Sequence, residues 1–167
     1  FTYHGFRYAV VLGITDEQAT EDLLTGIICS SAIEERGNFS CSDDTLNKLQ
    51  TMARNATVSN FYYFPTDCPQ REKNGWTGDA VNSCRQTHLN LNPDKSYKEW
   101  LRNIRKAQDE KGGIPAVIPT STWGYNNGPA WDAALTYLPY FTYLYRGDKD
   151  ILEENADALF KYCMFIT

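Results

Sequence analysis

The chain has 167 residues and a mass of 19.0 kDa; 42% of its residues are hydrophobic, 22% are charged, and its formal net charge is −5. This length allows one domain with its own core, and the composition is that of a globular chain rather than a disordered one. Phosphate binding requires a basic face, so the negative charge argues against a nucleic-acid partner. No run approaches the roughly 18 apolar residues of a membrane span, so we expect no membrane partner.

The first 35 residues have the character of β structure. The stretch 6–14 is rich in aromatic and β-branched residues with partial alternation, and the apolar stretch 23–32 predicts a second strand. We interpret residues 1–35 as the last strands and linker of a preceding β domain. The character changes near Gly37-Asn38, and from residue 36 onward the sequence is helical.

Helix signals follow one another along residues 36–167. Ser42 is a favourable N-cap for a helix with apolar residues at three- and four-residue spacing, namely Leu46, Leu49, Ala53 and Ala56. A second helix is predicted from about Asp79 to Leu89. Asn92-Pro93 is a cap and first-turn pair for a third helix. The buried stripe of that helix is expected to be Tyr97, Trp100, Leu101, Ile104 and Ala107.

The connection after the third helix is long. Residues 114–128 contain Pro115 and Pro119, and long loops in compact domains are usually functional. Pro129 begins a helix that is apolar on nearly every side and that Gly147 ends, and a last helix follows from about Asp150. About five helices joined alternately by short turns and longer loops suit an α-toroid around a central cleft.

Metal ligands are scarce in this chain. The cysteines form no CxxC pair and there are two histidines, so we expect no metal site and no cofactor. The favoured interpretation is that all cysteines are free, buried thiols in a reducing compartment. One disulfide with three free thiols is the alternative, and it leaves the compartment open. The five cysteines are Cys29, Cys41, Cys68, Cys84 and Cys163.

The stretch 66–80 concentrates the polar chemistry of the chain. It holds three carboxylates, an arginine and a tryptophan within thirteen positions, punctuated by Pro69, Gly75 and Gly78. Two glycines and a proline disfavour a helix, and an unstructured surface loop has no need of a tryptophan. The composition indicates a shaped loop that directs acids and an indole toward a sugar. Carboxylates bind or protonate sugar oxygens, and aromatic rings stack on the apolar face of a pyranose.

Glu72 is the candidate general acid. Cleavage of a glycosidic bond requires a proton from a carboxylic acid that an apolar or anionic neighbourhood keeps protonated. Trp76 is placed to desolvate Glu72, and Asp67 or Asp79 to favour its protonated form by like-charge repulsion. The alternative is that Glu72 forms an ion pair with a neighbouring base, Arg71 or Lys73, on a solvated loop.

The same stretch resembles a family signature. Asp67-Cys68-Pro69-Gln70-Arg71-Glu72, followed by Gly75-Trp76-Thr77-Gly78-Asp79-Ala80, is similar to the central motif of bacterial-type α-L-rhamnosidases, inverting glycoside hydrolases built on an (α/α)6 barrel. The chain lacks an optional Asp before the Glu and has Lys73 where Arg is usual. Residues 1–8 resemble the strand before the catalytic barrel, and residues 123–134 resemble a later aromatic loop and helix start. The resemblance therefore extends over nearly the whole chain.

The resemblance implies a mainly α fold, in which residues 1–35 end a β domain and residues 36–167 form the N-terminal part of an (α/α)6 catalytic toroid. It implies inverting hydrolysis of terminal α-L-rhamnosyl residues, with Glu72 as general acid and a general base beyond residue 167. The expected partners are a rhamnose-containing glycoside or polysaccharide and the remainder of the polypeptide. Residues 1–167 alone are therefore expected to be inactive.

The resemblance also implies substrate contacts. Asp67 and Asp79 would hold sugar hydroxyls, although Asp79 is also well placed to cap the following helix. Trp76 and Trp131 are candidates for stacking on the sugar, with packing in the core as the alternative.

Three further residues have two interpretations each. Arg71 would either donate to a sugar hydroxyl or hold the acidic cluster together. Asp132 would either contact substrate or act as a first-turn acid favoured by the helix dipole. Trp123 is open between a substrate contact and packing.

Two other functions compete with hydrolysis. One is a non-catalytic carbohydrate-binding relative that keeps the same pocket, and the other is a helical scaffold whose acidic loop is only structural. The acids and tryptophan of the loop argue against the scaffold. The residues alone indicate a neutral sugar with neighbouring hydroxyls, and rhamnose comes from the resemblance.

Overall fold

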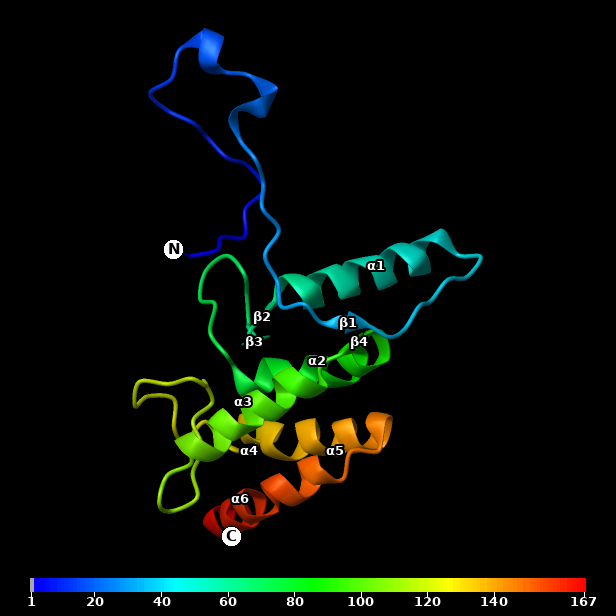
Figure 1. The fold of residues 1–167 in the computed structure, drawn as a ribbon. Coiled ribbons are helices and arrows are strands. Elements are labelled where there is room, and N and C mark those ends of the chain that lie inside the picture. The colour runs from blue at the N-terminus through cyan, green and yellow to red at the C-terminus, as the bar shows by residue number, and fades with distance from the viewer. Residues whose placement is uncertain (1) are drawn as a thin grey trace.

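A computed structural model describes residues 2–167; Phe1, which begins the stretch compared above with a strand, lies outside the described residues. The fold is mainly helical, as predicted, with two very short antiparallel ladders (Figure 1). The long helices are α1 (Asp44–Ser59), α2 (Thr77–Asn90), α3 (Asp94–Ala107), α5 (Ala134–Arg146) and α6 (Asp150–Ile166), and α4 (Pro129–Asp132) is a single turn.

Local capping signals explain where several helices begin and end. α1 starts one residue later than predicted, because the Asp43 carboxylate, not Ser42, accepts from the first free backbone N–H groups. α3 starts at Asp94 with Pro93 in the N-cap position, one residue later than the predicted pair of Asn92 as cap and Pro93 in the first turn. Gly147 ends α5 in the left-handed conformation, with φ of 70°. The helix predicted from Pro129 is divided at Ala133 into α4 and α5.

The predicted strands over 6–14 and 23–32 are wrong for this structure. Those stretches form an extended arm that leads away from the helices, with two 3-10 turns, η1 (Asp16–Gln18) and η2 (Glu21–Leu23) (Figure 1). A strand needs a neighbour for its backbone N–H and C=O groups, and within residues 2–167 nothing pairs with these stretches as a ladder. The assignment of residues 1–35 to the end of a β domain stays a prediction.

Two short ladders connect the helices to the rest of the chain. β1 (Glu34–Glu35) pairs antiparallel with β4 (Leu91–Asn92), which joins the end of the arm to the turn between α2 and α3. β2 (Phe61–Tyr62) pairs with β3 (Phe64–Pro65), a tight hairpin that leads directly into the stretch 66–80.

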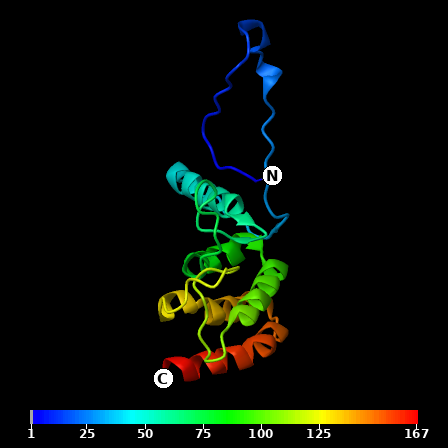
Figure 2. The ribbon, with the colours of Figure 1, turned by 90° about the vertical axis from the view of Figure 1, so that its left-hand side faces the viewer.

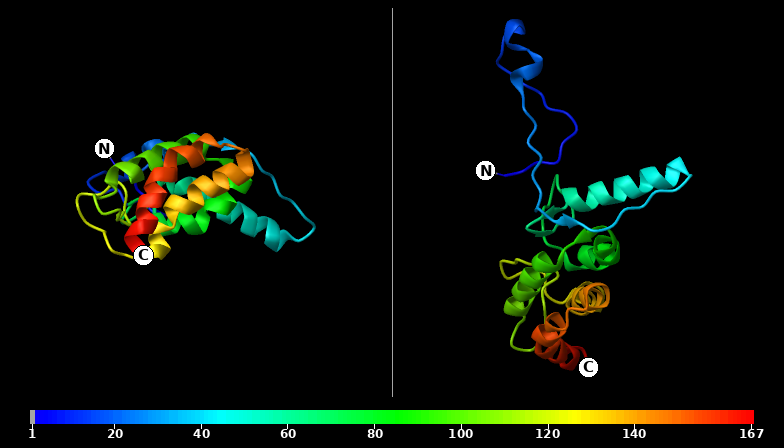
Figure 3. Two further views of the ribbon diagram at one scale, coloured as in Figure 1. Left: turned by 90° about the horizontal axis from the view of Figure 1, so that it is seen from below. Right: turned by 45° about the vertical axis from the view of Figure 1, so that its right-hand side comes forward.

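The core lies between α2, α3, α5 and α6. Figure 2 and the right-hand view of Figure 3 show the helices following one another from α1 to α6. The arm extends beyond α1, at the end of the molecule farthest from α6. α5 packs against α2, α3 and α6, and α1 packs against α2. The predicted α3 stripe is confirmed for four of its five residues, which are fully buried, and Ala107 is half-buried. The largest buried side chains include Trp100, Tyr97, Leu101, Ile104, Leu135, Leu138 and Ile151.

The long connection between α3 and α4 contains a buried segment. Residues 114–118 are packed into the core, and the Trp100 indole Nε1 donates to the Ile118 carbonyl oxygen at 2.8 Å. This segment lies under the stretch 66–80 and so forms part of its support. None of the helices within residues 2–167 combines the length and apolar character of a membrane span.

Candidate active site

The acidic loop, residues 66–80, is closed by its own backbone. The Asp67 N–H donates to the Asn74 carbonyl at 3.0 Å, and the Asn74 N–H donates to the Asp67 carboxylate Oδ1 at 2.9 Å. Lys73 turns the chain in the left-handed region, with φ of 56°. These contacts bring the two ends of segment 67–74 together, so the residues between them form a compact turn instead of an open surface loop.

Cys68 lies inside this turn and links its two acids. Its thiol donates to the second oxygen of the Asp67 carboxylate at 3.0 Å, and its sulfur accepts from the Glu72 N–H at 3.2 Å. All five cysteines have free thiols in the structure, as favoured above, but the expectation that they are buried is wrong: only Cys84 is buried, Cys68 is half-buried and the other three are exposed. Sequence reasoning missed this role of Cys68; its place between Asp67 and Glu72 in the motif was the available signal.

The second half of the loop is docked on the buried segment 114–118. The Ile118 N–H donates to the Gly75 carbonyl at 2.9 Å, and the Thr77 N–H donates to the Ala116 carbonyl at 2.8 Å. A Cβ on Gly75 would overlap the Ile118 carbonyl oxygen and crowd the Phe64 ring. A glycine is therefore required at this close approach, and the approach determines where Trp76 lies.

Glu72 accepts two hydrogen bonds. The Trp76 indole Nε1 donates to Oε2 at 3.0 Å, and the Arg71 guanidinium donates to Oε1 at 2.9 Å. The Arg71 side chain is 80% exposed and the Glu72 side chain 36%. The ion pair considered as the alternative for Glu72 is thus present, but so is an indole contact that an isolated surface pair would not have.

Three carboxylates gather around the loop. Burial and then the charges of Asp67 and Glu72 raise the pKa of Asp79, so Asp79 lies within electrostatic reach of both other acids. α2 begins at Thr77, so the interpretation of Asp79 as an N-cap is wrong; it lies in the first turn, where the helix dipole favours an acid.

Asp67 and Asp79 also line a common hollow. It has a volume of about 320 Å³ and lies between α1 and α2. Hydroxyl and amide groups from both helices complete its polar lining, among them Thr57, Ser83 and Gln86. Carboxylates and neutral polar groups of this kind are suited to the hydroxyls of an uncharged ligand.

Trp131 and Asp132 differ in exposure. The Trp131 side chain is 38% exposed, and its indole lies directly against Gly78, where a Cβ would approach Nε1 to 2.9 Å. Asp132 is 4% exposed, and burial raises the pKa of its carboxyl, which lies beside the Tyr162 hydroxyl of α6. The structure therefore brings Trp131 to the acidic loop and favours a packing role for Asp132.

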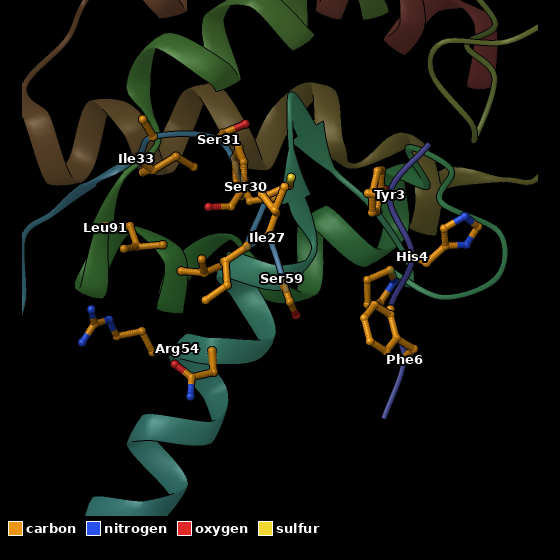
Figure 4. A pocket seen from close by; sticks show the side chains of 18 of the residues that line it. Tyr3, His4, Phe6, Ile27, Ser30, Ser31, Ile33, Arg54, Ser59 and Leu91 are labelled. Carbon is orange, nitrogen blue, oxygen red and sulfur yellow. The ribbon is translucent and has the colours of Figure 1, made fainter. Parts of the chain in front are cut away.

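A second hollow, larger than the one beside Asp67 and Asp79, lies elsewhere. It has a volume of about 900 Å³ and is enclosed by the arm, the β2 region and α1 (Figure 4). Tyr3, His4 and Phe6 lie on one side of it, with Ile27 and Arg54 across from them. It contains none of the seven residues predicted for the site. Within residues 2–167, no group of three or more His, Cys, Asp or Glu side chains is arranged to hold a metal ion.

Comparison with protein families agrees with the helical fold. The model of the bacterial α-L-rhamnosidase 6 hairpin glycosidase domain matches residues 34–167. A protein of Formosa agariphila named α-L-rhamnosidase is 35% identical over 164 residues, which cover 97% of this chain and 18% of that protein. A protein of the same name from Alteromonas sp. is 32% identical over 161 residues, with 95% and 18% covered. The chain spans less than a fifth of the length of these relatives.

Solved structures give the same result. The native α-L-rhamnosidase from Aspergillus terreus superposes with a TM-score of 0.87 at 32% identity, covering 95% of this chain and 19% of that one. The α-L-rhamnosidase from Dictyoglumus thermophilum gives 0.78 at 37% identity, with 82% and 16% covered. A Streptomyces avermitilis α-L-rhamnosidase complexed with L-rhamnose gives 0.75 at 26% identity, with 78% and 13% covered.

Proposed function

The chain belongs to the bacterial α-L-rhamnosidase 6 hairpin glycosidase family, and from this we propose that the protein containing it hydrolyses terminal α-L-rhamnosyl residues with inversion of configuration. The observation that carries the proposal is the Glu72 carboxylate, which an indole N–H orients at 3.0 Å beside Asp67 and Asp79 on one loop. That cluster is the chemistry a glycosidase requires, namely a proton donor next to groups that bind hydroxyls.

Glu72 is the proposed general acid, and we propose different roles for its two carboxylate oxygens. Trp76 donates to Oε2 from its indole N–H, and the backbone of Trp76 is held within the loop by a hydrogen bond to the Asn74 carbonyl. Arg71 donates to Oε1 from an 80% exposed side chain that is free to swing away. Once Arg71 leaves, Oε1 can carry the proton and deliver it to the glycosidic oxygen as the bond to the sugar breaks.

Asp67, Asp79 and Trp131 are the proposed substrate contacts. Asp79 is the freer of the two acids, because both Asp67 oxygens already accept contacts from within the loop. A carboxylate oxygen has two lone pairs, so Asp67 can still accept a sugar hydroxyl while it closes the turn. The Trp131 indole is covered by Gly78 on one side and 38% exposed, which leaves surface for a pyranose.

The general base is proposed to come from sequence outside these residues. An inverting glycosidase needs a second carboxylate about 6.5–9.5 Å from the acid, with room for a water molecule between them. Asp67 and Asp79 are assigned to binding, and the chain spans only 15–18% of the length of its relatives. Other parts of the protein can therefore supply the base across the cleft.

Replacement of Glu72 tests the proposal. In the full-length protein, we expect Glu72→Gln to lower kcat by at least about 10²-fold on a natural rhamnoside, the usual contribution of a general acid. An aryl rhamnoside with an activated leaving group should lose much less, because that group departs with little protonation. Glu110→Gln, a change at an exposed site outside the loop, is the matched control and should leave kcat unchanged on both substrates. An equal loss on both substrates would make Glu72 a binding residue, and a wild-type protein that binds the sugar without turnover would favour the carbohydrate-binding alternative.

A further inference from the structure

We propose that Trp123 is a positioning residue for Glu72 and acts through Trp76; the proposal rests on the function proposed above. Trp123 lies in the connection between α3 and α4, more than forty residues from the acidic loop in sequence. Its ring meets the Trp76 ring in an edge-to-face arrangement, with centroids 5.8 Å apart and an interplanar angle of 76°. Trp76 in turn donates from Nε1 to Glu72 at 3.0 Å. The two contacts form a continuous path from Trp123 to the acid.

Trp123 is itself held in place. The Thr120 hydroxyl donates to the Trp123 carbonyl at 2.6 Å, and the Trp123 N–H donates back to that hydroxyl at 3.3 Å. On the next residue, the Gly124 carbonyl accepts from the Ala116 N–H at 2.7 Å. Ala116 belongs to the buried segment 114–118, which also accepts a hydrogen bond from the acidic loop. The same segment therefore positions both the Trp76 and the Trp123 indoles.

The orientation of the Glu72 carboxylate depends on the contact between the Trp123 and Trp76 rings. An indole has one N–H, and that group reaches Oε2 only while the ring keeps its present rotation. The backbone of Trp76 is fixed by an isolated bridge to Val117, whereas its ring needs a neighbour to fix the rotation. An edge-to-face aromatic contact favours a particular ring orientation. Arg71 cannot replace the Trp76 indole as the group that orients Glu72, because the Arg71 side chain is 80% exposed.

A direct substrate contact by Trp123 makes a different prediction. The Trp123 side chain is 46% exposed, so a sugar or aglycone stacked on it would bind less tightly after its removal, and KM would rise. A positioning residue changes kcat, because it acts on the group that transfers the proton in the transition state.

The test uses Trp123→Ala, Trp123→Phe, Trp76→Phe and the double variant Trp123→Ala/Trp76→Phe in the full-length protein. We expect Trp123→Ala to lower kcat about 3- to 10-fold, the scale of one aromatic contact, with KM within about twofold. The loss should be greater with a poor leaving group than with an activated one, and Trp123→Phe should retain most of the activity. In the Trp76→Phe background the Trp123 change should cause no further loss, because residues that act through one another are not additive.

Two controls keep the outcomes distinct. Ser121→Ala, an exposed change in the same connection, should leave kcat unchanged. Far-ultraviolet circular dichroism detects the contact between the two indoles independently of any activity assay. Trp123→Phe and Trp76→Phe should each remove the same exciton couplet from the spectrum. A raised KM with unchanged kcat, or losses that multiply in the double variant, would overturn the proposal for Trp123. If Glu72→Gln is as active as wild type, it is the general-acid assignment that fails.

Discussion

At the scale of single residues, the candidate site depends on close approaches that leave no room for larger side chains. Gly75 lies against the Ile118 carbonyl and the Phe64 ring, and Gly78 lies against the Trp131 indole. Cys68 and Asn74 close the turn between them by contacts to Asp67. These small residues set the distance between the acidic loop and its support, and that distance sets where Glu72 and its indole partner meet.

Gly75→Ala tests this close approach. The added methyl group must displace backbone, so we expect the free energy of unfolding to fall by about 1–3 kcal/mol and kcat to fall with it, because the loop moves away from segment 114–118. Thermal unfolding and steady-state kinetics of the full-length protein measure both. Gly26→Ala is the matched control, since a Cβ there meets nothing within 4 Å. An unchanged midpoint and kcat for Gly75→Ala would show that the loop is not docked this closely.

At the scale of elements, α2 is the helix that presents the site, and its far end is anchored on α5 through His88. The His88 Nε2 lies 3.2 Å from the Thr142 hydroxyl, and its ring stacks on Tyr145 at 5.5 Å. Arg146 donates to the His88 carbonyl at 2.8 Å. Burial and then the Arg146 charge lower the pKa of His88 to about 4, so the α2–α5 contact requires a neutral imidazole.

This histidine predicts a loss of stability in acid. The pKa of His88 is 6.5 in the unfolded chain and about 4 in the fold, so between these values the unfolded state binds more protons and unfolding becomes easier as the pH falls. The contribution, roughly 3 kcal/mol in full, is present above pH 6.5 and lost by about pH 4. Urea unfolding at several pH values measures it. His88→Gln should flatten the pH dependence in that window, whereas His4→Gln, at an exposed position, should not; equal slopes for wild type and His88→Gln would contradict the assignment.

At the scale of the whole molecule, broad apolar faces are open to solvent. The sequence predicted that the helix after Pro129 would be apolar on nearly every side, and part of its surface is uncovered here. α1 exposes two of the apolar side chains that recur at three- and four-residue spacing along it, with Leu46 at 47% and Leu49 at 58%. The exposed apolar side chains on α5 and α6 include Tyr140, Leu144, Phe160 and Met164. Faces of this extent mark interaction surfaces, which agrees with helices of a larger toroid packing against them.

Residues 1–167 expressed alone should therefore self-associate and show no hydrolysis. The uncovered helix faces favour association, and the proposed general base is not among these residues. Light scattering after size exclusion and an assay on an aryl α-L-rhamnoside, with the full-length protein beside it, measure the two properties. A monodisperse monomer that turns over substrate would contradict both, and would mean that a base lies within these residues.

The sequence by itself determined the helices and the acidic loop. Pro93 and Gly147 affect the backbone within one helical turn of their own positions, and the spacing of Tyr97, Trp100 and Ile104 indicates which face of the helix is buried, so these features could be predicted from neighbouring residues. The concentration of acids and tryptophan in residues 66–80 predicted the candidate site for the same reason.

Only the tertiary structure decided how the loop is supported. Trp123 meets Trp76 across 47 positions of sequence, and Asp132 is buried beside Tyr162 of another helix; no local pattern encodes either contact. The arm was predicted to form strands because it is rich in β-branched residues. Strand formation also depends on a pairing partner, and residues 2–167 provide none for the arm. Helices satisfy their hydrogen bonds within a short segment, whereas strands, buried acids and paired indoles depend on what the rest of the chain brings beside them.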